Sequence, residues 1–118
     1  MLINFSNHPS CNWEQRQIEA ASIYGEVVDV AFPDVNAADD TDTIQRLADG
    51  YVRLIASMRK DSDIIVHVMG EMTFTYAVVS RLKELGIKCV ASTTERNAKD
   101  IGVGQKLSSF TFVRFRAY

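Results

Sequence analysis

Short apolar runs and longer amphipathic stretches alternate along the chain. The run over 63–69 is almost continuously apolar, which is typical of a strand covered on both faces. Between Ile44 and Met58 the apolar residues recur at i, i+3, i+4 and i+7, the spacing of a helix with one buried face. The pattern predicts strands over 2–5, 27–32, 63–69, 87–91 and 110–115, and helices over about 13–24, from 40–42 to 58, and over about 73–85.

Strands that alternate with helices predict one fold class. They form a mostly parallel sheet with helices on both faces, so we expect a three-layer α/β fold. Right-handed crossovers leave few topologies, of which we favour a five-stranded sheet in the order 2-1-3-4-5. The polar stretch over 92–109 shows no clear helix, which predicts that the last strand is antiparallel at the sheet edge. The whole chain, 1–118, is expected to be a single domain.

Composition and charge narrow the function classes. The chain is 47% hydrophobic and 24% charged, as in ordinary globular proteins. Thirteen basic against fifteen acidic residues give a net charge of −2, which argues against a protein that coats duplex nucleic acid. No apolar run approaches the ~20 residues of a membrane span, and the first residues do not resemble a secretory signal. Cys11 and Cys89 are not in a metal-binding spacing, so we expect reduced thiols in a cytoplasmic protein without a metal or cofactor.

Three polar segments directly follow predicted strands. They are 6–10, 70–75 and 92–96, and in the expected topology they meet at the switch point where α/β sheets bind ligands. The chain contains neither a G-x-x-x-x-G-K-[ST] motif nor a G-x-G-x-x-G motif, so a standard nucleoside triphosphatase or dinucleotide site is not supported. The residues expected to bind a ligand are Ser6, Asn7, Ser10, Gly70, Thr73, Thr75, Thr93 and Thr94.

Three residues in these segments are candidates for catalysis. Histidine is the residue type whose unperturbed charge change falls near neutral pH, so His8 is a candidate acid or base, or it can simply bond its loop. Glu71 can hold a ribose or act as a base or nucleophile, or it can stabilise a helix N-terminus. Arg96 can contact a phosphate, or it can pair with Glu95 or Asp100 on the surface.

Three further residues have less specific interpretations. His67 stands in the middle of an apolar strand, where a buried histidine with satisfied hydrogen bonds is the favoured interpretation. Asn4 is polar inside the first strand and can brace the site or a neighbouring backbone. Trp13 is favoured as a core residue of the first helix, with stacking on a base as the alternative.

Four segments together resemble a known family. They are Leu-Ile-Asn-Phe-Ser-Asn-His-Pro-Ser (2–10), Gly-Glu-Met-Thr-Phe-Thr-Tyr (70–76), Ser-Thr-Thr-Glu-Arg (92–96) and Phe-Thr-Phe-Val-Arg-Phe-Arg-Ala-Tyr (110–118). They resemble small, stand-alone CRISPR-associated proteins with a Rossmann-like core of the CARF type. The resemblance implies a homodimer that binds a cyclic oligoadenylate messenger across its two-fold axis, and some such proteins also cleave the ring. A lysine pair that some CARF domains carry close to the third helix is absent, which bears on catalysis more than on binding.

The resemblance also implies a mechanism. In a ring nuclease that needs no metal, an adenosine 2′-hydroxyl attacks its own 3′-phosphate. His8 would act as the base, while Arg96 and backbone N–H groups would stabilise the phosphorane charge. We expect His8, Glu71, Thr73 and Arg96 to converge on one pocket. Two alternatives stay open: a non-catalytic nucleotide-sensing module that regulates a partner, and a nucleoside-processing enzyme that uses Glu71.

Overall fold

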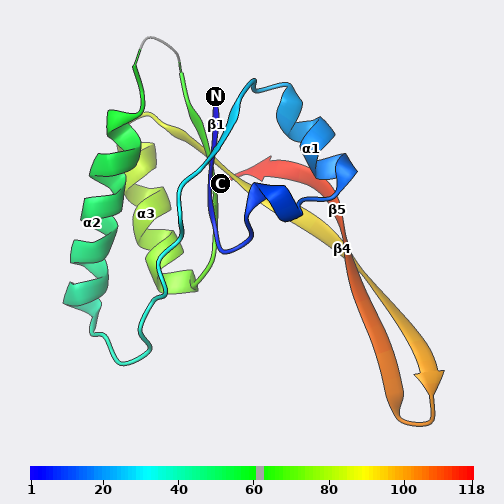
Figure 1. Cartoon of the computed structure of the whole chain (residues 1–118). Helices are drawn as coiled ribbons and strands as arrows, with labels where there is room; N and C mark the ends of the chain where they lie inside the picture. The colour runs from blue at the N-terminus through cyan, green and yellow to red at the C-terminus, as the bar shows by residue number, and fades with distance from the viewer. Residues whose placement is uncertain (61–62) are drawn as a thin grey trace.

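The computed structural model describes residues 1–60 and 63–118 (Figure 1). Its strands are β1 (Leu2–Ser6), β2 (Val27–Asp29), β3 (Ile65–Met69), β4 (Lys88–Gly102) and β5 (Gln105–Ala117), and its helices are η1 (Ser10–Asn12, 3-10), α1 (Gln15–Ser22), α2 (Thr41–Ser57) and α3 (Met72–Glu84). The Asp40 carboxylate caps α2 by accepting from the Thr43 N–H, as the run of helix-start residues predicts.

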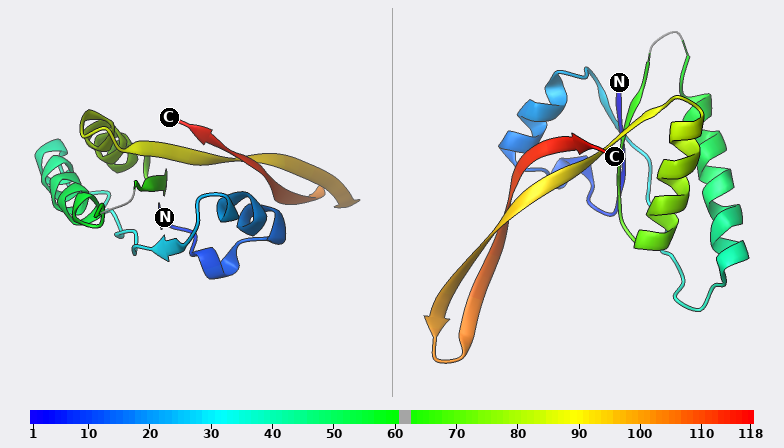
Figure 2. Two further views of the ribbon diagram at one scale, coloured as in Figure 1. Left: turned by 90° about the horizontal axis from the view of Figure 1, so that it is seen from above. Right: turned by 180° about the vertical axis from the view of Figure 1, so that it is seen from behind.

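The sheet has the order β2-β1-β3-β4-β5, which confirms the predicted topology. The first four strands are parallel, and β5 runs antiparallel to β4 at the edge. Helices α2 and α3 cover one face, and α1 covers the other (Figure 2). No helix within 1–60 or 63–118 is long and apolar enough to cross a membrane.

The two faces of the sheet carry separate cores because side chains alternate along each strand. In β1, Ile3 and Phe5 lie in the larger core against α2 and α3, whereas Leu2 packs with Trp13 and Ala21 on the α1 face. The aromatic rings of the larger core form one cluster with centroids 5.0 to 6.0 Å apart, made of Phe5, Phe32, Tyr51 and Phe74.

Strand β2 is shorter than predicted and ends at Asp29 instead of residue 32. The chain beyond it leaves the sheet and places the Phe32 ring against Gly70, where an added Cβ would overlap that ring. Gly70 is therefore required by packing, independently of any role in ligand binding. We expect Gly70→Ala to lower the free energy of unfolding by about 1–3 kcal/mol, as overpacked cores do. Urea denaturation measures this, with Gly50→Ala as the matched control, since a Cβ there meets nothing within 4 Å.

The stretch over 92–109, for which the sequence predicts no helix or strand, is mostly strand. Strand β4 continues to Gly102, turns at 103–104, and returns as β5 in antiparallel register from Gly102↔Gln105 to Ser92↔Phe115. The two strands form a long hairpin that projects from the sheet (Figure 1). A strand is predicted from apolar residues at every second position, which form one apolar face. The projecting hairpin is polar along most of its length, so the sequence did not predict strands there.

The first helix also begins later than predicted. The sequence predicts a start at about residue 13, but η1 continues to Asn12 and Trp13 is extended. Glu14 takes the N-cap position instead, and its carboxylate accepts from the Phe112 backbone N–H on β5. This bond ties the start of α1 to β5.

Candidate functional site

Four neighbouring strands place polar side chains in one row on the α1 face of the sheet. Asn4 of β1 pairs in register with Asp29 of β2 and with His67 of β3. His67 pairs in turn with Val90 of β4, and Ser92 lies two residues further along the same face. Asn4 and His67 are buried, whereas Asp29 at one end is exposed and Ser92 at the other is half-buried.

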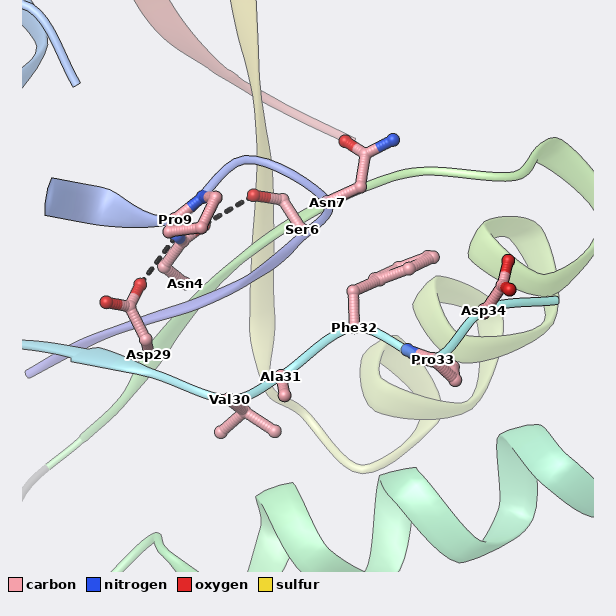
Figure 3. A pocket seen from close by; sticks show the side chains of 10 residues that line it. All are labelled: Asn4, Ser6, Asn7, Pro9, Asp29, Val30, Ala31, Phe32, Pro33 and Asp34. Carbon is pink, nitrogen blue, oxygen red and sulfur yellow. Dashed lines mark hydrogen bonds between the residues drawn. The ribbon is translucent and has the colours of Figure 1, made fainter. Parts of the chain in front are cut away.

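Hydrogen bonds connect this row from end to end. The Asn4 amide nitrogen donates to Asp29 Oδ1 at 2.7 Å (Figure 3). It also donates to the His8 carbonyl at 3.0 Å, and the two bonds fix the orientation of the carboxamide. Asn4 Oδ1 therefore faces His67 Nδ1 at 2.8 Å as an acceptor. Because Nδ1 must carry the proton, Nε2 of the neutral imidazole is the acceptor for the Ser92 hydroxyl at 2.8 Å.

His67 is held neutral by its surroundings. The residue is 2% exposed, and the Trp13 and Phe115 rings meet its imidazole edge-on at 5.6 and 5.4 Å. Burial, with a smaller contribution from nearby His8, lowers the pKa of His67 from 6.5 to about 4. At neutral pH the imidazole is therefore an uncharged base whose Nε2 lone pair accepts from the Ser92 hydroxyl.

A pocket of about 370 Å³ opens beside this imidazole, and we call it the His67 pocket. It lies where β1 and β3 end and the hairpin begins, which is the usual ligand position in an open α/β sheet. Gln17, although only 7% exposed, lines it without a side-chain hydrogen bond to another described residue. The full lining is Ser6, Asn7, His8, Asn12, Glu14, Gln17, His67, Met69, Ser92, Thr94, Phe110 and Phe112.

A second cavity of about 590 Å³ lies on the other side of β1, and we call it the Phe32 cavity (Figure 3). Ser6 and Asn7 line both cavities, and Asp29 and Phe32 belong to this one alone. Partial burial acts to raise the pKa of Asp29, but hydrogen bonds from Ser10 and Asn4 outweigh it and lower the pKa. Asp29 is therefore an anchored carboxylate at neutral pH, and it holds the Asn4 end of the row in place.

Residues 1–116 match the family model described as Uncharacterized protein MJ1673 family. The chain belongs to this family. No curated protein and no solved structure matches it. The family match includes the hairpin as well as the sheet, so the wall that β4 and β5 contribute to the His67 pocket lies inside the matched region.

Two of the three predicted polar segments meet at the His67 pocket. Ser6, Asn7 and His8 reach it from the end of β1, and Thr94 reaches it from β4. Ser10 does not line it, because its hydroxyl donates to Asp29 Oδ2 at 2.6 Å.

The third segment, 70–75, does not reach the His67 pocket, because Glu71 and Thr73 make hydrogen bonds at the N-terminus of α3. The Glu71 carboxylate accepts from the backbone N–H groups of Phe74 and Thr73 and from the Thr73 hydroxyl. The Phe74 N–H, then the Thr73 hydroxyl and N–H, lower the pKa of Glu71. Gly70 and Thr75 line a separate pocket of about 280 Å³, where Thr75 Oγ1 has no partner among the described residues.

The expected convergence of His8, Glu71, Thr73 and Arg96 on one pocket is therefore not found within a single chain. Thr73 lines a different pocket, beside α2. Arg96 is carried outward because β4 continues as a strand, and its guanidinium donates to Ser108 Oγ at 3.2 Å. Thr93 is on the opposite face of β4, where its hydroxyl donates to the Arg114 carbonyl at 3.1 Å.

The sequence did not predict the residues of the hydrogen-bonded row as functional residues. The expectation that His67 is buried with satisfied hydrogen bonds is confirmed, and Asn4 does brace a neighbouring backbone through the His8 carbonyl. A signal was present in the period of two, since Asn4 and Ser6 share one face of β1. His67 and Ser92 lie beside Asn4 and Ser6 because of the register between strands. The pattern of a single strand does not predict that register. Among residues 1–60 and 63–118, no group of three or more His, Cys, Asp or Glu residues is arranged to hold a metal ion.

Proposed function

We propose that this protein binds cyclic oligoadenylate at the His67 pocket as a homodimer and cleaves the ring. The observation that carries the proposal is the lining of the pocket. Three of the four segments that resemble CARF-type proteins contribute to it, with His8 from 2–10, Thr94 from 92–96 and Phe110 from 110–118. The pocket is also at the sheet edge where such folds bind ligands.

The size of the pocket fits one nucleotide unit of a ring. Its volume, about 370 Å³, is near the lower end of the ~300–1,000 Å³ of small-molecule sites. The exposed Phe110 ring offers an aromatic face for an adenine, and the Asn7 and Gln17 amides can bond base edges. A whole ring then needs the same patch from a second copy, which a two-fold axis supplies.

The proposed chemistry is transesterification within the ring. His8 takes the proton of an adenosine 2′-hydroxyl, the O2′–P bond forms, and the O5′–P bond breaks. A 2′,3′-cyclic phosphate remains, and the leaving 5′-oxygen takes a proton from water to become a 5′-hydroxyl. His8 is exposed at the pocket and its backbone is anchored by Asn4, so its imidazole is placed without being committed to an internal bond. Arg96 reaches the phosphate only if a second copy presents it.

The direct test is incubation of the protein with cyclic tri-, tetra- and hexa-adenylate, with and without EDTA, followed by chromatography. We expect linear products with a cyclic phosphate end, formed equally in EDTA. His8→Ala should slow cleavage more than it weakens binding, since a base acts mainly in the transition state. Light scattering should give the mass of a dimer.

Two adjacent threonines give a matched pair of binding variants. Thr94→Ala removes a pocket hydroxyl and should weaken binding about 2- to 10-fold, the size of one neutral hydrogen bond. Thr93→Ala, one residue away on the other face, should leave the affinity unchanged. Calorimetric titration measures both. Binding without products would reduce the protein to a nucleotide sensor, and no binding of any ring would overturn the proposal. The Glu71 nucleoside enzyme is disfavoured, because that carboxylate is engaged in capping α3.

A further inference from the structure

Asn4, His67 and Ser92 form a chain with the order of an orienting group, a base and a nucleophile. Asn4 Oδ1 is 2.8 Å from His67 Nδ1, and His67 Nε2 is 2.8 Å from Ser92 Oγ. Both distances are those of well-formed hydrogen bonds. Nucleophilic enzymes are recognised by this geometry and not by sequence position, since the same constellation recurs on unrelated folds.

The orientation of the Asn4 amide decides whether His67 Nε2 can act as a base toward Ser92. An asparagine in this place can present either its oxygen or its NH₂ to the imidazole, and only the oxygen selects the tautomer in which Nε2 is the base. Here the NH₂ is taken by the Asp29 carboxylate and the His8 carbonyl. Asn4 therefore presents its oxygen, and His67 Nε2 keeps its lone pair toward Ser92.

We propose that Ser92 is a nucleophile for acyl transfer in the His67 pocket, with His67 as its general base and Asn4 as the positioning residue, and that the substrate is a short-chain carboxylic ester. The proposal does not rest on the binding of cyclic oligoadenylate. It assigns the pocket a second chemistry, carried by side chains that the ring-cleavage proposal leaves unused.

The surroundings of Ser92 fit an ester. The Met69 thioether, 3.0 Å from Ser92 Oγ, and the Phe112 ring give an apolar wall for an acyl chain. The Ser92 backbone N–H donates to that thioether at 3.3 Å, and because sulfur is a weak acceptor, a developing oxyanion would compete with it for this N–H. The Gln17 carboxamide, which makes no hydrogen bond to another described residue, is a second donor in the same pocket.

The reaction balances in two steps. Ser92 Oγ attacks the ester carbonyl, and His67 Nε2 takes the hydroxyl proton. The bond from carbon to the alkoxy oxygen breaks, and the alcohol leaves with the proton from His67, which gives an acyl-Ser92. Water then attacks the acyl carbon, passes one proton to His67, and releases the carboxylic acid with Ser92 restored.

A fluorophosphonate probe tests the nucleophile directly. In the full-length protein, Ser92 Oγ should form a bond to phosphorus with loss of fluoride, and intact-mass and peptide mass spectrometry should locate one adduct on Ser92. Hydrolysis of p-nitrophenyl acetate, followed by p-nitrophenolate absorbance, should be lost with the adduct. Cyclic oligoadenylate added as a competitor separates the two proposals, since labelling without protection upholds this one and counts against nucleotide binding in the same pocket.

The variants assign the roles. Ser92→Ala should abolish the adduct, and His67→Gln, which keeps a hydrogen-bonding side chain but no base, should slow labelling roughly 10²–10⁴-fold. Asn4→Leu should slow it as well. Asn4→Asp combined with Asp29→Asn, which exchanges donor and acceptor between the two side chains and still offers an oxygen to His67 Nδ1, should restore most of the rate. Ser109→Ala, in the exposed hairpin, is the matched control and should label like the unaltered chain. Absence of an adduct on Ser92, or equal labelling of His67→Gln, overturns the proposal.

A pH profile of the unaltered chain tests the base without any variant. With His67 already neutral, the labelling rate should be flat from pH 6 to pH 8. An unassisted serine would instead gain roughly tenfold per pH unit, as its alkoxide fraction rises. The other titratable groups facing the row or the pocket are His8, Glu14 and Asp29. His8→Gln should leave the profile flat, and a tenfold rise per pH unit would refute assistance by His67.

Discussion

Replacing Phe5 by alanine is expected to lower the free energy of unfolding by about 3–5 kcal/mol. Phe5 is fully buried at the centre of the larger core, where its ring contacts Phe32, Tyr51 and Phe74. The truncation removes apolar surface from contact and leaves a cavity that strand β1, paired on both sides, is not free to close. Urea denaturation followed by circular dichroism gives the value.

Ile23→Ala is the control for this measurement. Ile23 is also a large apolar residue, but it is 78% exposed after α1. Its truncation should change the free energy of unfolding by no more than about 0.5 kcal/mol. A loss below 1 kcal/mol for Phe5→Ala would contradict the central place that the structure gives to this ring.

Lowering the pH from 7 to 5 is expected to lower the free energy of unfolding by about 2 kcal/mol through the protonation of His67 alone. The pKa of His67 is about 4 in the folded chain and 6.5 when the imidazole is free in the unfolded chain. In this window the unfolded chain binds more protons, so acid favours unfolding. The contribution is fully present above pH 6.5 and is lost progressively as the pH falls toward 4. Urea titrations at a series of pH values measure the slope.

His67→Gln isolates this effect, since the readout is a slope and not an absolute stability. The variant is less stable at every pH because it disturbs a buried hydrogen-bonded chain. Its stability should nevertheless fall much less between pH 7 and pH 5 than that of the unaltered chain. His8→Gln serves as the matched control, because the exposed His8 should leave the slope nearly as it was. An unchanged slope in His67→Gln would show that other groups carry the acid response.

The fold could be predicted from the sequence because it depends on the local periodicity of apolar residues. The candidate site could be predicted only in part. Strand order and the antiparallel last strand come from alternating periods and crossover rules, and the structure has both. The segment after β1 was correctly expected to carry pocket residues. The segment after β3 was expected there too, but the Glu71 carboxylate is used by the first N–H groups of α3. The sequence alone does not distinguish a polar residue that binds a ligand from one that caps a helix, when that residue stands between a strand and a helix.

The hydrogen-bonded row needed information that no local pattern holds. In the sequence, His67 is 63 residues from Asn4 and 25 residues from Ser92, and the three meet only because the pairing of β1 with β3 and of β3 with β4 brings them together. The long hairpin was missed for a related reason. Its strands are held mainly by each other, so neither face needs the apolar alternation by which strands are recognised.

The projecting hairpin divides the molecule into two parts that should open independently. Every described side chain from 95 to 110 is exposed, so this outer part is held by its own cross-strand bonds, and a two-stranded ribbon alone is marginally stable. In deuterium, its amides should therefore exchange through local opening within minutes. The amides of β1 and β3, flanked by strands on both sides, should exchange only when the whole domain unfolds. Core substitutions such as Phe5→Ala would then accelerate exchange throughout the sheet and leave that of the outer hairpin unchanged.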